Sequence, residues 1–432
     1  MKIEPLILDT SKRNFNKRFL DRLRINSSMN KKTQSLVNSI LSNVKNKGDI
    51  SLLSYINKYD GYRLKKINDI FITKKQINEA YTYIDKAQLN NLKKSISRIR
   101  KFAKKQKLTS WSSLDDGTML GEKINPIESV GVYVPAGKAS YPSTVLMNVI
   151  PAKVAGVKTI IMACPIDSIE DHALAIVAAD LCKVDKICRM GGAHAVAALT
   201  YGSNSIPSVD KIVGPGNIYV TLAKKSVFGE VGIDNIAGPS EVVIIADRSN
   251  NPDWIAIDLF SQAEHDELAQ PILISSSSQV LKNVQSSIKK LLPSMLRKKI
   301  ILKSFNNRGM FIRTKNDREI VKIVNTIAPE HLEIMSKNNK ALLKDITNAG
   351  AIFLGEYSPE VFGDYCAGPN HVLPTSGSAR FSSPLGVEDF QKRSSIMHIS
   401  KKTASYLSKI SVSMALSEGL QAHALSAKLR DK

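Results

Sequence analysis

The sequence predicts an α/β protein with two Rossmann-like domains, each a parallel sheet flanked by helices, and with helical N- and C-terminal extensions. From residue 127 onward, short apolar runs that end in glycine or proline alternate with helical patterns. The same alternation resumes after residue 240. Repeated strand–helix units of this kind form a parallel sheet that is covered by helices on both faces.

The first 125 residues read as a helical lead-in. Apolar residues recur there at spacings of three and four, which is the period of a helix with one buried face. The segments with this pattern are 33–48, 51–60, 73–84 and 85–106.

The first α/β unit follows. Its expected strands lie in the runs 128–138, 157–164, 186–192 and 210–216. Each run precedes a helical pattern, at 143–156, 169–182, 193–202 and 217–229. The strands are rich in β-branched residues and the helices in alanine and leucine, so local propensity agrees with the alternation.

The second α/β unit begins with EVVIIAD at residue 241. Its strands are expected in 241–247 and 270–277, and its helices in 253–267 and 279–292. Segment 350–386 is rich in Gly, Pro and Ser and reads as a long irregular loop, which in a compact domain is often functional. Segment 404–430 reads as a C-terminal helical pair.

Composition indicates a globular, multidomain protein. The chain has 432 residues, of which 43% are hydrophobic and 23% charged, so it is too apolar for disorder. No apolar run approaches the roughly 20 residues of a membrane span, and the N-terminus lacks the pattern of a secretory leader. Without a CxxC pair, free thiols in a reducing compartment are expected for Cys164, Cys182, Cys188 and Cys366. We expect a soluble, cytoplasmic protein.

The net charge of +22 is concentrated near the N-terminus. Residues 1–110 hold 26 of the 61 lysines and arginines but 8 of the 39 acids. One interpretation is a nucleic-acid-binding region; the alternative, which we favour, is solvated lysine on helical surfaces. No zinc-finger spacing, RNP-like motif or glycine/arginine tract accompanies the charge.

Two short motifs could supply catalytic or metal-binding groups. In SQAEHD, Gln262 and His265 are three apart, so on a helix they would share one face, as paired metal ligands do. The alternative is an exposed polar helix end. In APEHLEI, Pro329 favours a turn or helix start and places Glu330 beside His331, a carboxylate and an imidazole that could exchange protons near neutral pH. The glutamate could instead serve only the helix dipole.

Two later motifs extend this set. GDYCAGPNH contributes Asp364 and His371 from the irregular segment, and EGLQAH contributes Glu418 and His423 from a helix near the end of the chain. Each has an ordinary structural explanation on its own. Together the motifs supply two imidazoles, one carboxylate and one amide oxygen, which would make a zinc shell with room for substrate.

Eight ordered motifs resemble those of the histidinol dehydrogenase family. They are GVYVPAGK, STVLMNVIPAKVAG, VGPGN, AGPSEV, SQAEHD, PEHLEI, GDYCAGPNHVLPT and SSPLGVEDFQKRSS, and they cover residues 120–400 densely. The resemblance implies an enzyme of histidine biosynthesis that oxidises L-histidinol through L-histidinal to L-histidine with two NAD in sequence. It also implies one zinc ion per subunit and a homodimer with shared active sites.

The resemblance implies a role for each matched residue. The zinc ligands would be Gln262, His265, Asp364 and His423, the last from the neighbouring subunit. His331 and Glu330 would be the acid/base pair, with zinc positioning the substrate. Substrate contacts would come from the ligands and His331, together with Ser240, His371 and Glu418. NAD contacts would come from Tyr133, His194 and Asn217.

The cofactor assignment depends on the resemblance, because no GxGxxG motif follows a strand. The family usually has glutamine in the motif GGAQA, whereas this chain reads GGAHA, so His194 replaces an amide with an imidazole. This replacement is therefore expected to affect the affinity for NAD or the pH dependence of that affinity.

The resemblance also implies domain boundaries. Residues 1–26 would form an N-terminal extension. Residues 27–132 plus 240–386 would form a discontinuous domain that carries zinc and the catalytic pair, and 133–239 an inserted NAD-binding domain. Residues 387–432 would form a C-terminal helical domain that reaches the partner's site. The alternatives to this function are a zinc hydrolase with Glu330 as base, a basic nucleic-acid-binding protein and a catalytically inactive paralogue.

Overall fold

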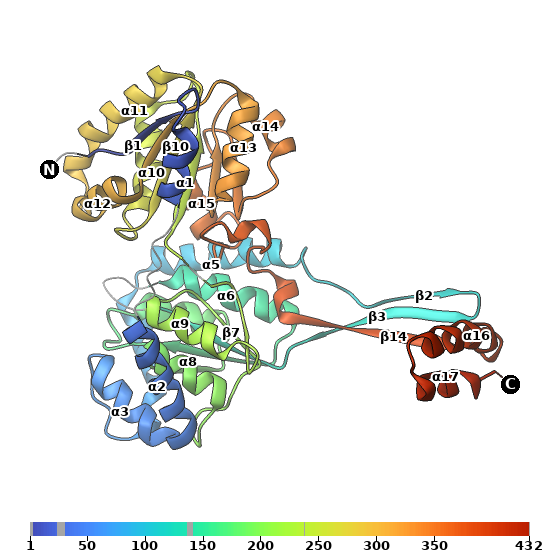
Figure 1. Ribbon diagram of the computed structural model, residues 1–432. Helices are drawn as coiled ribbons and strands as arrows, with labels where there is room; N and C mark the ends of the chain where they lie inside the picture. The colour runs from blue at the N-terminus through green and yellow to red at the C-terminus, as the bar shows by residue number, and fades with distance from the viewer. Residues whose placement is uncertain (1–2, 24–30, 136–140, 237, 432) are drawn as a thin grey trace.

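The computed structural model describes residues 3–23, 31–135, 141–236 and 238–431. It has two α/β halves and a long arm that projects from them (Figure 1). Both halves contain a parallel sheet between two layers of helices, as the sequence predicts. Residues 136–138 of the GVYVPAGK motif and Ala237 of AGPSEV lie outside the described residues.

One half contains a six-stranded sheet in which all neighbouring strands are parallel. Its strands, in spatial order, are β1 (Leu6–Asp9), β11 (Met310–Arg313), β10 (Gln270–Ser275), β9 (Glu241–Ile245), β12 (His331–Ile334) and β13 (Ala351–Leu354). Helices α10 (Pro252–Ala263), α11 (Ser278–Leu291) and α12 (Lys298–Arg308) bury apolar residues against one face. Helices α1 (Phe15–Leu23), α13 (Asp317–Ile327) and α14 (Asn339–Asp345) cover the other.

The other half contains a five-stranded parallel sheet. Its spatial order is β6 (Lys186–Arg189), β5 (Thr159–Cys164), β4 (Ser129–Tyr133), β7 (Lys211–Val213) and β8 (Gly232–Ile233). One face packs against α4 (Lys74–Ala80), α5 (Lys86–Ala103), α6 (Pro142–Ala155) and α7 (Ala173–Leu181). The opposite face packs against α2 (Lys31–Lys47), α3 (Asp49–Tyr59), α8 (Gly192–Tyr201) and α9 (Ile218–Val227).

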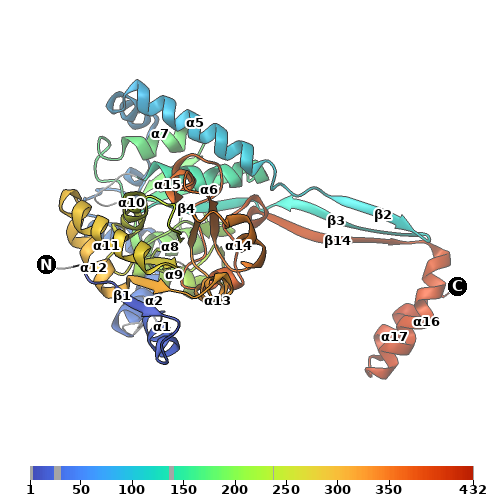
Figure 2. The same cartoon turned by 90° about the horizontal axis from the view of Figure 1, so that it is seen from above.

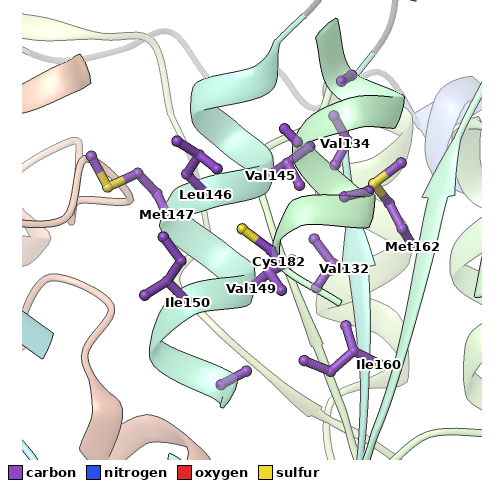
Figure 3. Packing of buried hydrophobic residues seen from close by; sticks show 14 of the residues in the cluster. Val132, Val134, Val145, Leu146, Met147, Val149, Ile150, Ile160, Met162 and Cys182 are labelled. Carbon is purple, nitrogen blue, oxygen red and sulfur yellow. The ribbon is translucent and has the colours of Figure 1, made fainter. Parts of the chain in front are cut away.

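Helix α6 shows how a central helix of this half is held. Its apolar residues are buried on almost every side, as expected for a helix enclosed by other elements. Figure 3 shows Val145 and Val149 of this helix facing Val132 of β4 and Ile160 of β5. At about 25 cal/mol per Å² of apolar area, such burial is the main stabilising contribution to this core.

The arm is a three-stranded antiparallel ribbon. Strand β3 (Thr118–Pro126) pairs with β2 (Trp111–Asp115) on one side and with β14 (Gln391–Ile399) on the other. All residues of β2 are exposed. The ribbon leads away from both halves to α16 (Lys401–Ser417) and α17 (Gln421–Lys428) at its far end (Figures 1 and 2).

The observed packing corrects three of the predicted boundaries. The described part of the predicted extension 1–26, residues 3–23, is not an appendage, because β1 completes the six-stranded sheet and Phe19 is buried beside it. Segment 27–132 was assigned to the same domain as 240–386, but buried residues of α2 to α5 pack in the cores of the five-stranded half. The predicted C-terminal helical domain begins with a 3₁₀ turn (Val387–Phe390) and the strand β14, and its helical pair lies within 401–428.

The predicted irregular segment 350–386 contains strand β13 and a short helix, α15 (Glu360–Tyr365), and is otherwise without regular structure apart from a single 3₁₀ turn. All four cysteines are free thiols. No helix among the described residues is long and apolar enough to span a membrane.

Candidate active site

Glu330 and His331 lie at the N-terminal edge of the six-stranded sheet. His331 is the first residue of β12, so of the two predicted alternatives after Pro329, a turn or a helix start, the helix start is wrong: a strand begins there. Its neighbour β9 begins at Glu241, whose backbone N–H donates to Glu330 Oε2 at 2.9 Å. Both members of the pair are buried, His331 at 4% and Glu330 at 8% exposure. The sheet therefore holds the imidazole and the carboxylate out of contact with bulk water.

Gln262 reaches the same place from the last turn of α10. It is fully buried, and its Nε2 lies 3.0 Å from His331 Nδ1, 3.2 Å from the Glu241 carbonyl oxygen and 3.3 Å from Glu330 Oε2. Its Oε1 is buried and has no hydrogen-bond partner among the described residues. The amide nitrogen thus contacts both members of the Glu330–His331 pair and leaves the amide oxygen available.

His265 does not share a helix with Gln262. Helix α10 ends at Ala263, and His265 follows in a turn in which its backbone N–H donates to the Gln262 carbonyl at 3.2 Å. The turn continues the helical path of α10. His265 therefore stays close to the cluster, on the side of the cluster that faces solvent. Loss of hydration disfavours the charged imidazolium and lowers the pKa of His265, whereas the Asp364 carboxylate acts in the opposite direction.

Helix α15 supplies two more carboxylates. Asp364 Oδ1 lies 3.5 Å from His331 Nε2, and Glu360 Oε2 lies 3.8 Å from His331 Nδ1. His371 follows in the loop, with its Nδ1 3.0 Å from the Asp364 carbonyl oxygen. The resulting cluster contains Glu330, His331, Gln262, His265, Asp364 and His371, as the motifs predicted. Ser240 directly precedes β9, beside Glu241.

Burial dominates the electrostatics of this cluster. It raises the pKa of Glu330 to about 7 and that of Glu360 to about 8. Burial together with the nearby Glu330 carboxylate raises the pKa of Glu241 to about 8. Burial acts in the opposite direction on His331, but the carboxylates of Glu330, Glu360 and Asp364 outweigh it and raise its pKa to about 10.

The donor set fits a zinc ion only in part within one chain. No three His, Cys, Asp or Glu side chains of the described residues are grouped as a metal site. However, the free amide oxygen of Gln262, the Asp364 carboxylate and the His265 imidazole are ligand types that zinc accepts. A cation there would also relieve the repulsion between the buried carboxylates.

The remaining predicted residues lie elsewhere. Glu418 follows the last residue of α16 and His423 lies on α17, and both are exposed. These helices are at the tip of the arm, far from α10 and α15 (Figure 1). Within one chain, the structure does not bring Glu418 and His423 to the cluster.

Tyr133, His194 and Asn217 line a separate pocket of about 450 Å³. It lies at the carboxyl edge of the five-stranded sheet, which is where sheets of this type bind their ligands. Gly214 has φ +113°, and a Cβ atom there would lie 2.0 Å from the Tyr133 carbonyl oxygen, so only glycine lets the GPGN loop pack against β4.

Both helix N-termini at this pocket are already capped. The Asn217 side chain accepts hydrogen bonds from the backbone N–H groups of Tyr219 and Val220 in α9. At α8, the Gly192 N–H donates to the Tyr133 hydroxyl at 3.1 Å. His194 is 1% exposed, and its Nε2 lies 2.9 Å from Asp60 Oδ2. Its imidazole is therefore held by a carboxylate, and it stacks against Tyr59.

Comparison with known proteins identifies the family. Residues 23–431 match the family model described as histidinol dehydrogenase. The chain belongs to the histidinol dehydrogenase family. It is 52% identical over 394 residues to histidinol dehydrogenase of Pseudomonas fluorescens (strain Pf0-1), covering 91% of this chain and 89% of that protein. It is also 52% identical over 392 residues to histidinol dehydrogenase of Dechloromonas aromatica (strain RCB), with 90% of each covered.

The fold agrees with that family as well. The crystal structure of histidinol dehydrogenase from Elizabethkingia anophelis superposes with a TM-score of 0.94 at 31% identity, covering 100% of this chain and 98% of that one. A histidinol dehydrogenase is an oxidoreductase, so this chain is an enzyme of that class.

Sequence reasoning missed several residues that this member of the histidinol dehydrogenase family places at its sites. Glu241 and Glu360 face His331, and Asp60 holds His194. For Glu241 the signal was an acid directly before the apolar run VVII. For Asp60 there was none, because it is 134 residues from His194.

Proposed function

We propose that this enzyme oxidises L-histidinol through L-histidinal to L-histidine, with two NAD and one zinc ion per subunit. Membership of the histidinol dehydrogenase family supports the substrate. The observation that supports the chemistry is a buried Glu330–His331 pair whose His331 Nε2 has no hydrogen-bond partner among the described residues. His331 Nε2, the proposed proton acceptor, thus lies in the cluster where the proposed zinc ligands from separate segments of the chain meet.

His331 accepts the hydroxyl proton of the substrate when the first hydride leaves. His331 Nδ1–H donates to the Glu241 carbonyl at 3.2 Å and this bond orients the ring, which leaves Nε2 for the substrate. Gln262, His265 and Asp364, with His423 of the partner subunit, would hold zinc, which would position the substrate and offset the negative charge of the carboxylates around His331.

Glu330 acts in the second oxidation. Its pKa of about 7 allows it to take a proton from a water that adds to the aldehyde and to release it again near neutral pH. Its Oε2 is held by the Glu241 N–H at 2.9 Å, so the carboxylate keeps one orientation through both steps.

The pocket at the five-stranded sheet is the proposed NAD site. NAD, when bound, accepts one hydride in each oxidation. Tyr133 and His194 form its walls, and Asn217 stabilises the helix that borders it. Because the His194 imidazole is already paired with Asp60, it acts here as a wall more than as a hydrogen-bond donor to the cofactor.

The active site is proposed to need two subunits. Glu418 and His423 lie at the tip of an arm whose apolar side chains Leu114, Leu120 and Met397 are exposed. Exposed apolar patches of this kind mark protein interfaces. A homodimer in which each arm reaches the other subunit would bury these side chains and bring His423 to Gln262, His265 and Asp364. Free thiols support a cytoplasmic location.

The test is to count NADH formed from limiting L-histidinol by the zinc-loaded protein. Two NADH per histidinol are expected, and His331→Asn and Glu330→Gln should lower kcat by about 100-fold or more because each removes a proton-transfer group. Glu79→Gln, an exposed change on α4, is the matched control and should leave the rate unchanged. Absence of NADH from the folded, zinc-loaded protein would contradict the proposal and favour hydrolytic substrates.

A further inference from the structure

The segment that joins Asp364 to His371 crosses from one half of the molecule to the other. Asp364 lies on α15, whose Glu360 backbone N–H donates to Glu333 of β12 in the six-stranded half at 2.7 Å. Val372, directly after His371, is buried in the core of the five-stranded half. The intervening segment therefore bridges the halves, where α15 lies beside α5 and α6 (Figures 1 and 2).

Helix α5 of the five-stranded half holds the first part of this segment. Arg98 Nε donates to the Cys366 carbonyl oxygen at 2.7 Å. Gly368 has φ +132°, and a Cβ atom there would lie 3.1 Å from Phe102 Cβ. Glycine is therefore favoured both by the backbone conformation and by the close approach to the helix. The segment is thus packed against α5 before it reaches His371.

Helix α6 holds the second part through one of its own backbone carbonyls. Pro151 lies inside α6 and has no N–H, so the Met147 carbonyl, four residues earlier, lacks the donor that an α-helix normally provides. Met147 is fully buried, and its side chain points away from the strands in Figure 3. Asn370 Nδ2 donates to this carbonyl oxygen at 2.7 Å. Asn370 thus supplies the hydrogen bond that Pro151 cannot make, to a buried acceptor that is costly to leave unpaired.

The same side chain fixes the backbone on both sides of His371. Asn370 is buried, and its Oδ1 accepts from the Val372 N–H at 2.8 Å, which closes an Asx-type turn around His371. The His371 ring is held from the other half, because its Nδ1 lies 3.0 Å from the Asp364 carbonyl oxygen. A carbonyl only accepts, so Nδ1 is the donor of this bond and Nε2 takes no part in it. The position of His371 therefore depends on contacts with both halves.

We propose that Asn370 is a positioning residue for His371. By docking on the Met147 carbonyl that Pro151 leaves without a helical donor, it fixes the substrate-contacting imidazole relative to both halves of the molecule. This inference rests on the proposed function, because the contact between His371 and the substrate belongs to that function. A contact group that is displaced by a small distance slows a reaction even when every chemical group is still present. Asn370 was not among the residues singled out from the motif GDYCAGPNH.

The first test separates positioning from stability. Asn370→Ala should lower the Tm of the zinc-loaded protein, because the Met147 carbonyl loses its donor. Adding Pro151→Ala restores an N–H inside the helix, so the double variant should recover most of the lost Tm, with Pro151→Ala alone as its reference. The double variant should not recover the rate. Both Asn370 variants should show kcat/KM for L-histidinol about tenfold or more below the wild type, with the KM for NAD within about twofold.

Asn250→Ala is the matched control. Asn250 is buried, its Nδ2 donates to the Met335 carbonyl oxygen at 3.0 Å, and its Oδ1 accepts from the Asp247 N–H at 2.9 Å. It makes the same two kinds of bond at the carboxyl edge of the six-stranded sheet, so its loss should lower the Tm but keep kcat/KM. Recovery of the rate together with the Tm in the double variant, or an equal loss of rate in Asn250→Ala, would overturn the proposal. If Asn370→Ala alone does not fold, the double variant carries the test.

A second measurement needs neither substrate nor NAD. Hydrogen–deuterium exchange of peptides that cover residues 366–373 should be at least about tenfold faster in both Asn370 variants and unchanged in Asn250→Ala, because the Val372 N–H loses its acceptor. If exchange changes in this way but the wild type forms no NADH, the proposed reaction fails and Asn370 keeps its role in holding the segment. Unchanged exchange in both Asn370 variants would overturn that role, whatever their rates.

Discussion

At the residue scale, the region around His331 buries more acids than one imidazole can balance. Glu333 lies two residues along β12 and is 1% exposed, and Asp258 on α10 lies beside it. Burial raises the pKa of Asp258 to about 6 and that of Glu333 well above its usual value. In the absence of a bound cation, the folded protein therefore retains protons that the unfolded chain would release.

This protonation makes stability depend on pH. A carboxyl whose pKa is higher in the folded state binds more protons there, so the free energy of unfolding decreases as pH rises from about 4.5 toward 8. Glu333→Gln removes one such group, while its amide oxygen can still accept from the Glu360 N–H. Between pH 5 and 8 the free energy of unfolding of the variant should therefore decrease less than that of the wild type.

Urea unfolding of the chelator-treated protein at several pH values measures this difference. Glu79→Gln, on an exposed surface, serves as the control and should follow the wild type. If the free energies of unfolding of Glu333→Gln and the wild type changed equally with pH, the Glu333 carboxyl would be ionised in the folded state. That result would contradict the prediction.

The motifs predicted which residues form the cluster but not how they are held. Gln262, Glu330 and His331 could be named from sequence because each lies in a distinctive local motif. The Asp60 contact that buries His194 could not, since it depends on tertiary packing. For the same reason the motif GGAHA predicts a changed cofactor contact at His194 but not the contact of its imidazole with Asp60.

At the element scale, helical periodicity and the strand–helix alternation located most helices and the buried strands of both sheets. The arm was not predicted. Its strands β3 and β14 are about 270 residues apart. Strand β14 is mostly exposed and β3 mostly half-buried on both faces, so neither shows the apolar alternation of a strand with one buried face. Strand β1 was also missed, because a four-residue edge strand carries little pattern of its own.

The arm offers a test of its proposed role in dimerisation. Met397 pairs with Leu120 across the ribbon, and both are exposed at 67% and 48%. Met397→Asp should shift the protein from dimer to monomer and lower activity at least about tenfold at low protein concentration, because a charge would be buried at the interface. Sedimentation velocity and NADH formation measure the two effects.

Leu296→Asp provides the matched control, since Leu296 is fully exposed on the six-stranded half, away from the arm. It should leave both the dimer and the rate unchanged. A Met397→Asp protein that remains dimeric and fully active would show that the arm's apolar face is not the interface.

At the scale of the whole molecule, the two proposed sites lie on different parallel sheets and at opposite edges of them. The cluster around His331 lies at the N-terminal edge of the six-stranded sheet, and the proposed NAD pocket lies at the carboxyl edge of the five-stranded sheet. The basic N-terminal region covers the latter half with helices such as α5, whose apolar side is buried and whose lysines are exposed. This arrangement agrees with the interpretation of the N-terminal charge as solvated lysine side chains on helical surfaces.

In the proposed enzyme two chains complete one active site, with Glu330 and His331 from one chain and His423 from the other. The most direct test is a mixed dimer of His331→Asn and His423→Asn chains, co-expressed with different tags and purified through both. Each parent dimer should be inactive. The mixed dimer holds one intact site and should recover about half of the wild-type rate of NADH formation, because independent sites contribute equally. A mixed dimer as inactive as its parents would contradict the shared site.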